Sequence, residues 1–317
     1  MSDPRLIRNV VLAVALGVAV AVALALTASL PATLEALGRF RWRLAPLVVG
    51  AVLTNYLLRF LKWHLYVTRL AIPLGWRPSA LVFLAGFTMA ISPGKVGELL
   101  KAVLVRDLVG TDPSRTASAV MAERLTDVAG LLILSALGAT ALPHGPLVLG
   151  GVAGLLIVTI LAVRIPGLAR RAIPERILAT RLTGQIRLFV RAGRGLLEPG
   201  VLTVAVLVSV VSWFFECLAL YLILDGLGAP IPLRAATFLY AFASLAGAVS
   251  MLPGGLGVAE GSLTGLLVGL GARLPDAAAA TLLVRAATLW LAVSLGLVTL
   301  LAAFRGGSTV MERPSTP

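Results

Sequence analysis

The sequence predicts an all-α integral membrane protein on three observations: an apolar composition, long apolar runs, and a Pro-Gly break that occurs twice. Of its 317 residues 59% are hydrophobic and 13% are charged, and the mean hydropathy is +0.99. A soluble domain of this size does not present such a composition to water. We expect one polytopic domain over residues 1–305, with about six transmembrane helices and two re-entrant helical hairpins, and a disordered tail over 306–317.

The basic residues predict the orientation. Eight arginines lie between Arg164 and Arg194 with Glu175 as the single acid, and the positive-inside rule makes this connection, residues 164–198, cytoplasmic. Counting crossings from it places both termini in the cytoplasm, in a multi-pass protein of the cell inner (plasma) membrane. The formal net charge of +13 then reflects loops that face anionic lipid rather than nucleic acid.

The first predicted helix covers residues 6–30 and is too long for a signal-peptide core, so we expect it to be retained. Pro31 begins a connection, and a second helix covers residues 44–70. Cationic and aromatic side chains gather in its C-terminal part: Arg59, Lys62, Trp63, His64 and Tyr66. This pattern is typical of an interfacial helix end, where such side chains reach the headgroups. Arg59 lies deepest and fits that interpretation least.

The apolar piece at residues 79–91 is too short to cross, at about 20 Å of helix. Pro93-Gly94 interrupts it, and a second short helix follows over about 95–108. This pattern predicts a re-entrant hairpin over residues 79–108, which membranes tolerate only inside protein or against a wet cavity. A helix over 114–137 completes a first repeat, residues 44–140, and a helix over 147–163 leads to the basic connection.

The second half follows the same plan over residues 200–305. A helix over 201–224 is followed by a hairpin over 233–271, broken at Pro253-Gly254-Gly255, and by a last helix over 275–304. With the basic connection in the cytoplasm, the two hairpins open on opposite sides of the membrane. The sequence therefore predicts an inverted-topology repeat, the plan of many transporters.

Superimposing the two Pro-Gly breaks also aligns charged residues. Glu98 falls near Glu260, and Arg124 falls within one residue of Arg285. Charged groups inside a membrane cost roughly 2.5 to 3.5 kcal/mol each on insertion scales and often mark a pathway. The short helices after the breaks can also direct N-terminal amides at an anion.

We therefore expect four cations to bind the substrate: Lys95, Lys101, Arg124 and Arg285. Five acids are expected to balance charge or to couple transport to protons: Glu98, Glu123, Asp127, Glu216 and Glu260. The alternative is that these groups only neutralise one another as structural pairs. The expected hairpin breaks are Pro93, Gly94, Gly97, Pro253, Gly254, Gly255 and Gly257. The prolines end helices, while the glycines permit tight turns or close packing, and packing is the favoured interpretation of Gly97.

Signatures of an enzyme are absent from the sequence. His64 and His144 are the two histidines and lie in different segments, and Cys217 is the single cysteine. Gly94-Lys-Val-Gly97 lacks the spacing and the Lys-Ser/Thr ending of a P-loop. We predict no catalytic residue, no metal and no cofactor.

Four segments of the chain are similar, in order and spacing, to a known family. They are Ser92-Pro-Gly-Lys-Val-Gly-Glu-Leu-Leu-Lys101 with Val105-Arg-Asp107, Ala122-Glu-Arg-Leu-Thr-Asp127, Leu252-Pro-Gly-Gly-Leu-Gly-Val-Ala-Glu-Gly261, and Leu283-Val-Arg-Ala286. The chain thereby resembles the lysylphosphatidylglycerol synthase transmembrane, or flippase-like domain, family, as a stand-alone member without a synthase domain. The resemblance implies a lipid-translocating protein. Fused members move an aminoacylated phosphatidylglycerol, and stand-alone members are linked to other lipids, including polyprenyl-linked sugars.

We predict a flippase that moves an anionic lipid, either a phospholipid or a polyprenyl-phosphate-linked lipid, through a polar groove between the repeats. The two alternatives are a secondary transporter of a small anionic solute and a non-transporting scaffold for a membrane lipid or glycan synthase. Expected partners are the anionic lipid and a membrane-associated synthase or glycosyltransferase. The many small residues fit either a homodimer or packing within one chain.

Overall fold

A computed structural model describes residues 4–92, 97–139 and 192–305, with isolated positions between 150 and 189. All regular structure in these residues is helical, which confirms the all-α class. Some predictions fall outside the described residues: the break at Pro93 and Gly94, the site residue Lys95, the helix over 147–163, most of the basic connection, and the tail over 306–317.

The N-terminal segment consists of two helices where the sequence predicted one helix and a connection. Helix α1 (Pro4–Thr27) and helix α2 (Leu30–Arg39) meet at an angle of 98°. Pro31 lies in the first turn of α2, where a missing backbone N–H costs no helical hydrogen bond. The connection that was predicted to begin at Pro31 is therefore helical over Leu30–Arg39.

Three further helices have the length and apolar character of membrane spans. They are α3 (Ala45–Arg69, with the short turn η1, Trp42–Leu44, before it), α11 (Pro199–Gly226), and the continuous run of α14 (Leu274–Arg285), the π-helical turn η5 (Ala286–Trp290) and α15 (Leu291–Arg305). The bent α1–α2 pair makes a fourth candidate within the described residues. Helix α6 (Pro113–Ala139) is 27 residues long but carries several charges. The total of about six crossings stays a prediction.

Two pairs of short helices lie where the hairpins were predicted. The first comprises α4 (Trp76–Gly86), the turn η2 (Phe87–Met89) and α5 (Leu100–Val109). The second comprises α12 (Leu233–Val249), the turn η4 (Pro253–Gly255) and α13 (Val258–Gly269). In each pair the two helices pack against each other. Their re-entrant course in a membrane stays a prediction.

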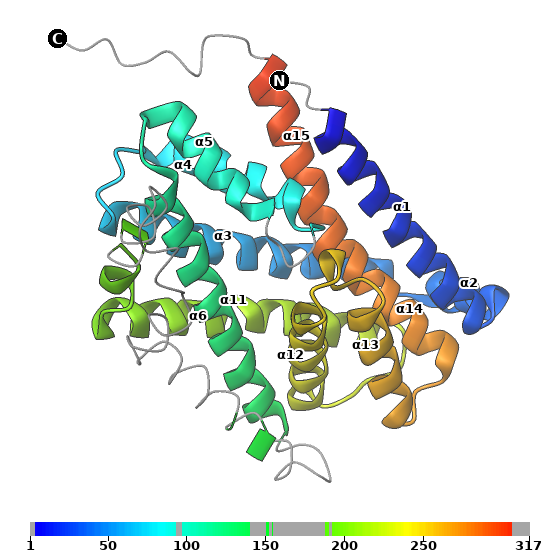
Figure 1. The fold of residues 1–317 in the computed structure, drawn as a ribbon. Coiled ribbons are helices and arrows are strands. Elements are labelled where there is room, and N and C mark those ends of the chain that lie inside the picture. Colours follow the sequence, from blue (N-terminus) through cyan, green and yellow to red (C-terminus); the bar gives the residue numbers. More distant parts are fainter. Residues whose placement is uncertain are drawn as a thin grey trace, which may run out of the picture.

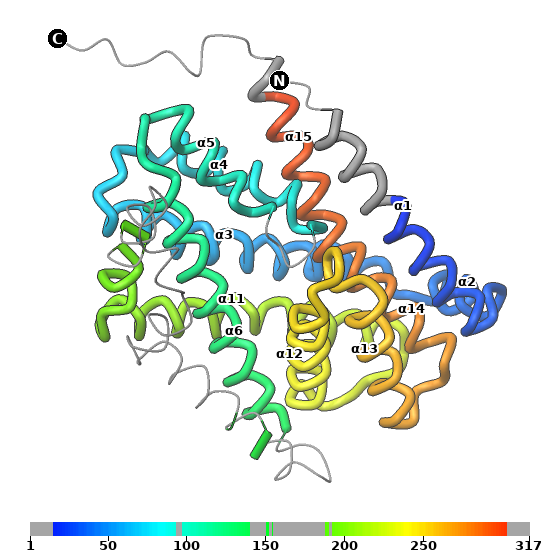
Figure 2. Tube along the Cα trace, in the orientation of Figure 1, coloured from blue at the N-terminus to red at the C-terminus, as the bar shows by residue number. Residues whose placement is uncertain are grey.

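The two halves pack crosswise. Helices α3 and α11 contact each other along much of their length, α6 packs on α12, and α15 packs on α4 and η2. Figures 1 and 2 show α15, at the red end of the chain, running past the α4–α5 hairpin. The last helix of each half thus contacts the hairpin of the other half.

Glycines allow the crosswise helices to approach backbone to backbone. A Cβ added at Gly138 of α6 would lie 2.7 Å from the carbonyl oxygen of Arg234 in α12. One added at Gly296 of α15 would lie 2.9 Å from the carbonyl carbon of Phe87 in η2. Such close approach without side chains is a common way for membrane helices to pack.

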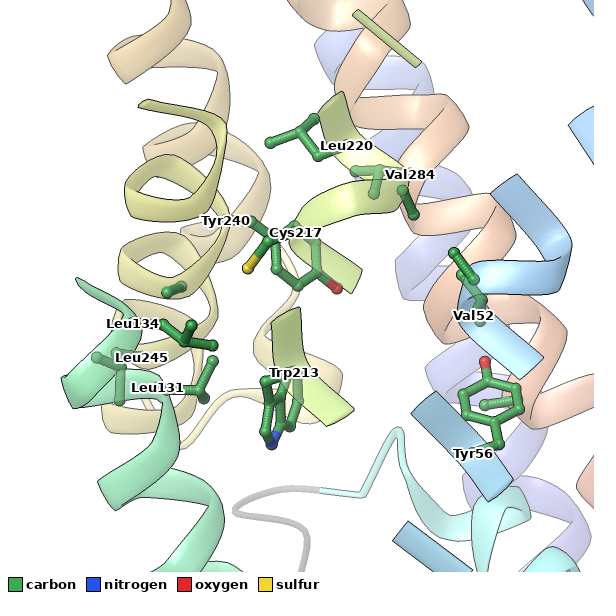
Figure 3. Close-up of a cluster of buried hydrophobic side chains, with 14 of the residues drawn as sticks. Val52, Tyr56, Leu131, Leu134, Trp213, Cys217, Leu220, Tyr240, Leu245 and Val284 are labelled. Carbon is green, nitrogen blue, oxygen red and sulfur yellow. The ribbon is translucent and has the colours of Figure 1, made fainter. Parts of the chain in front are cut away.

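The apolar core lies where helices of both halves meet. Figure 3 shows Tyr56 of α3, Leu131 of α6, Trp213 of α11, Tyr240 of α12 and Val284 of α14 in one buried cluster. Each of these side chains is at most 6% exposed. The helices that pack in this cluster, α3, α6, α11 and α14, also carry the charged residues described next.

Candidate functional site

A cavity of about 340 Å³ lies between the two halves. Three arginines line it, Arg59 from α3, Arg124 from α6 and Arg285 from α14, together with three acids, Glu98, Asp127 and Glu216. Its other walls are mainly apolar and aromatic, and they include Tyr56, Phe87, Trp213 and Tyr240. The cavity therefore collects cations that lie more than 200 residues apart in the chain.

Arg59 is buried between aromatic rings. Its guanidinium carbon lies 5.7 Å from the ring centre of Phe87 and 5.4 Å from that of Trp213, within the range of cation–π attraction. Its Nη2 lies 3.7 Å from Glu123 and 3.8 Å from Asp127. The sequence did not single out Arg59 as a site residue, although its depth already fitted an interfacial end poorly.

Lys62 is also inside the protein. It is 1% exposed, and its Nζ donates to Asp127 Oδ1 at 2.6 Å, to Ser209 Oγ at 2.6 Å and to Thr126 Oγ1 at 3.2 Å. The neighbouring Trp63 and Tyr66 side chains are fully buried. The interfacial interpretation of this part of α3 is therefore wrong for these residues, because they face other helices instead of the headgroups.

Lys101 forms the second buried lysine pair. Its Nζ donates to Glu123 Oε2 at 2.9 Å and lies 4.7 Å and 4.8 Å from the ring centres of Trp63 and Phe83. Gly86 leaves room for the lysine stem, because an added Cβ would lie 2.6 Å from Lys101 Cε. Lys101 is not among the residues that line the cavity, so in this conformation it holds Glu123 in place.

Arg124 lies at the centre of the acidic group. Its Nη2 is 2.8 Å from Glu98 Oε2, 3.4 Å from Glu123 Oε1 and 3.6 Å from Asp127 Oδ2. Within the described residues, Arg124 Nε and Nη2 and Arg59 Nε are nevertheless buried without a hydrogen-bond partner. Buried donors in a native protein are nearly always paired. The facing oxygens, Glu98 Oε2, Glu123 Oε1 and Asp127 Oδ2, are also without a hydrogen bond among the described residues, so an oxyanion would compete with these carboxylates for the arginines.

In the second half, Arg285 binds the hairpin turn. Its Nε donates to Glu260 Oε1 at 2.5 Å and its Nη2 to the carbonyl oxygen of Gly254 at 2.8 Å. Glu260 also accepts the backbone N–H of Gly257 at 2.7 Å, at the start of α13. The backbone φ angles of Gly254, Gly255 and Gly257 are 61°, 68° and 85°, a region that glycine enters without a Cβ clash.

The other predicted positions have separate environments. Glu216 accepts the Tyr240 hydroxyl at 2.6 Å and lines the cavity. Gly97 donates its N–H to Ser92 Oγ at 2.8 Å, and a Cβ there would lie 2.6 Å from that oxygen. This close contact fits the packing interpretation of Gly97.

The structure thus joins most of the predicted charges into two groups. One contains Lys101, Arg124, Glu98, Glu123 and Asp127, and the other contains Arg285 and Glu260. Arg59 and Lys62, which also belong to the first group, were not predicted as site residues. A signal was available, because Asn55, Arg59 and Lys62 recur at helical spacing on one face of an apolar helix.

Comparison with known proteins gives a family match over most of the chain. A family model described as "Lysylphosphatidylglycerol synthase TM region" matches residues 10–296. A UPF0104 membrane protein of Methanothermobacter thermautotrophicus is 28% identical over 262 residues, which cover 76% of this chain and 77% of that protein. A second protein of that name and organism is 31% identical over 116 residues, 37% of this chain and 33% of its own length.

Proposed function

This chain belongs to the lysylphosphatidylglycerol synthase transmembrane family, and from that premise we propose that it moves an anionic lipid between membrane leaflets. The observation that carries the proposal is the convergence of Arg59, Arg124 and Arg285 on one cavity between the two halves. Arginine presents a planar fork that matches phosphate oxygens. The group they bind is the phosphate of a phospholipid or of a polyprenyl-phosphate-linked lipid.

The mouth of the cavity supports a lipid over a water-soluble anion. Met121 of α6 and Leu252 beside η4 line the cavity and are 50% and 44% exposed. Residues that line a cavity and also reach the surface mark its opening, and both of these are apolar. A lipid can place its phosphate inside while its tails leave through this opening into the bilayer.

The crosswise packing of the halves supports an inverted repeat. In this proposal both hairpins are re-entrant from opposite faces of the inner membrane, both termini are cytoplasmic, and the site lies near the midplane. Arg59 and Arg124 bind the phosphate, and Arg285 contributes its charge while it anchors the second hairpin. Lys101 acts through Glu123, and a headgroup contact by Lys95 stays a prediction. A membrane-bound synthase or glycosyltransferase supplies the lipid.

Transport by reconstituted protein tests the proposal. Proteoliposomes with a fluorescent phosphatidylglycerol report flipping through its loss of protection from an external quencher. Loss of two charge-assisted contacts, at about 1.5–3 kcal/mol each, predicts that the double variant Arg59→Gln, Arg124→Gln flips at least about 100-fold more slowly. The control Arg106→Gln changes an exposed arginine of α5 and should flip at the parental rate.

The same vesicles separate the rival functions. Uptake of labelled inorganic phosphate without lipid flipping would favour a solute transporter. Parental flipping by the double variant would refute the arginine site. If the parent protein moves neither phosphatidylglycerol nor a short-chain polyprenyl phosphate, the translocase proposal is wrong, and a scaffold for a synthase becomes the better explanation.

A further inference from the structure

A glutamate of each hairpin contacts the arginine of the helix that follows it. Glu98, just before α5, lies 2.8 Å from Arg124 of α6. Glu260, in the first turn of α13, lies 2.5 Å from Arg285 of α14. The two pairs occupy corresponding places in the two halves, so they can be compared directly.

The two pairs differ in how well they are bonded. Glu260 and Arg285 are joined by a hydrogen bond, and both also bond the backbone of the turn, at Gly257 and Gly254. Glu98 Oε2 and Arg124 Nη2 are close, but neither atom has a hydrogen bond within the described part of the chain. The Glu98–Arg124 pair is therefore held by charge alone, whereas the Glu260–Arg285 pair is also hydrogen-bonded to the backbone of its hairpin turn.

The charges around Arg124 explain what Glu98 does. Glu123 has its own lysine, Lys101, and Asp127 has Lys62, each at hydrogen-bond distance. Among the described residues the ion pair of Glu98 is with Arg124. The ion pairs around Arg124 join four cations (Arg59, Lys62, Lys101, Arg124) to three acids (Glu98, Glu123, Asp127), and Glu216 also lines the cavity. Glu98 is thus the least firmly held of the three carboxylates beside Arg124.

We infer that Glu98 is a displaceable internal counterion, which occupies the place of the ligand's phosphate at Arg124 until the ligand arrives. The inference rests on the proposed function, because it assumes that Arg124 binds a phosphate. Two negative groups cannot share the arginine in a medium of low dielectric constant without strong repulsion. Binding therefore moves Glu98 away and breaks one of the two ion pairs between the first hairpin and α6, while the Lys101–Glu123 pair remains.

Removal of the competing charge should strengthen binding. We titrate the full chain in detergent with two probes, dihexanoyl phosphatidic acid and inorganic phosphate, and measure Kd by calorimetry. Glu98→Gln should lower the Kd for the phosphatidic acid about tenfold, which corresponds to about 1.4 kcal/mol. The matched variant Asp107→Asn should give no tighter binding, because it neutralises an exposed acid of α5 that pairs with Arg106 outside the cavity. A tenfold gain with both probes assigns the effect to the phosphate, and a gain with the lipid probe alone requires the tails.

The outcomes separate this inference from the proposed function. If the parent binds the phosphatidic acid and Glu98→Gln binds equally or more weakly, the counterion inference is overturned while the site stands. If neither the parent nor Glu98→Gln binds either probe, both are overturned. Should Glu98→Gln fail to give monodisperse protein, Glu98→Asp makes the same test, since it withdraws the carboxylate by one methylene. Its Kd should then lie below that of the parent, and a higher Kd overturns the inference.

Discussion

Replacement of Lys62 by methionine should destabilise the protein strongly, although the residue lies in a segment that reads as an interfacial helix end. The ammonium is 1% exposed and donates to Asp127, Ser209 and Thr126. Methionine keeps the unbranched shape of the lysine stem, one atom shorter, but leaves Asp127 as a buried carboxylate. The cations that remain near Asp127 Oδ2 are Arg59 Nη2 at 3.8 Å and Arg124 Nη2 at 3.6 Å, both beyond hydrogen-bond distance.

The two nearby arginines compensate in part for the lost lysine, and this sets the expected loss in the free energy of unfolding. Breaking a buried ion pair costs about 3–5 kcal/mol when the partner is left alone, and because two arginines stay nearby we expect about 3 kcal/mol for Lys62→Met. Neutralising the stranded acid as well, in Lys62→Met, Asp127→Asn, should recover part of this loss. A double-mutant cycle should therefore give a coupling energy of about 2 kcal/mol.

Reversible unfolding in mixed micelles, with a rising fraction of sodium dodecyl sulfate, measures these free energies. The control is Arg106→Met, which breaks a pair whose side chains are 53% and 43% exposed and should cost less than about 1 kcal/mol. A loss below about 1 kcal/mol for Lys62→Met would show that the ammonium is hydrated at the interface, as the sequence pattern suggested, and would refute the buried network.

Two further predictions concern the contacts between the halves. Gly296→Ala should lower the free energy of unfolding by about 1–3 kcal/mol in the same assay, because its Cβ would meet the backbone of Phe87 and Thr88 in η2. The control is Gly265→Ala, whose Cβ would meet nothing within 4 Å. Equal effects of the two substitutions would contradict the close packing at Gly296. Tyr56→Phe removes a hydrogen bond of 2.5 Å to the carbonyl oxygen of Thr288 in the π-helical turn. It should cost about 1–2 kcal/mol and speed amide hydrogen exchange in η5, whereas unchanged exchange there would show that the bond does not hold the turn.

The sequence predicted helix limits well where they depend on residues close together in the chain. The helices α3 and α11 begin and end within two residues of their predicted limits, and α12 and α13 lie on either side of the break in the predicted hairpin over 233–271. Apolar runs, prolines and glycines act on neighbouring residues, so such limits are predictable. The pairing of Glu260 with Arg285 was one of the open alternatives. Helix α2 was not predicted, since proline disrupts a helix interior but is accepted in a first turn, where Pro31 lies.

The site was only partly predictable, because a charge near a helix end has two stable locations. A lysine can extend to the headgroups or bond an acid of another helix, and the choice depends on what packs against it. Asp127 and Ser209, which hold Lys62, lie 65 and 147 residues away. No pattern within α3 contains those partners, so only their juxtaposition in the fold distinguishes the two locations.

The unequal arginine pairs suggest which part of the molecule moves. Release of the second hairpin would break the bonds of Arg285 to both Glu260 and the carbonyl of Gly254, and it would free that buried backbone carbonyl, which needs a new partner. At the first hairpin, displacement of Glu98 exchanges one carboxylate for a phosphate at Arg124, so the number of charges at the arginine is conserved while the Lys101–Glu123 pair keeps α5 on α6. Ligand-dependent motion should therefore be confined to the first hairpin, and amide hydrogen exchange should rise in α5 but not in α13 when the lipid binds.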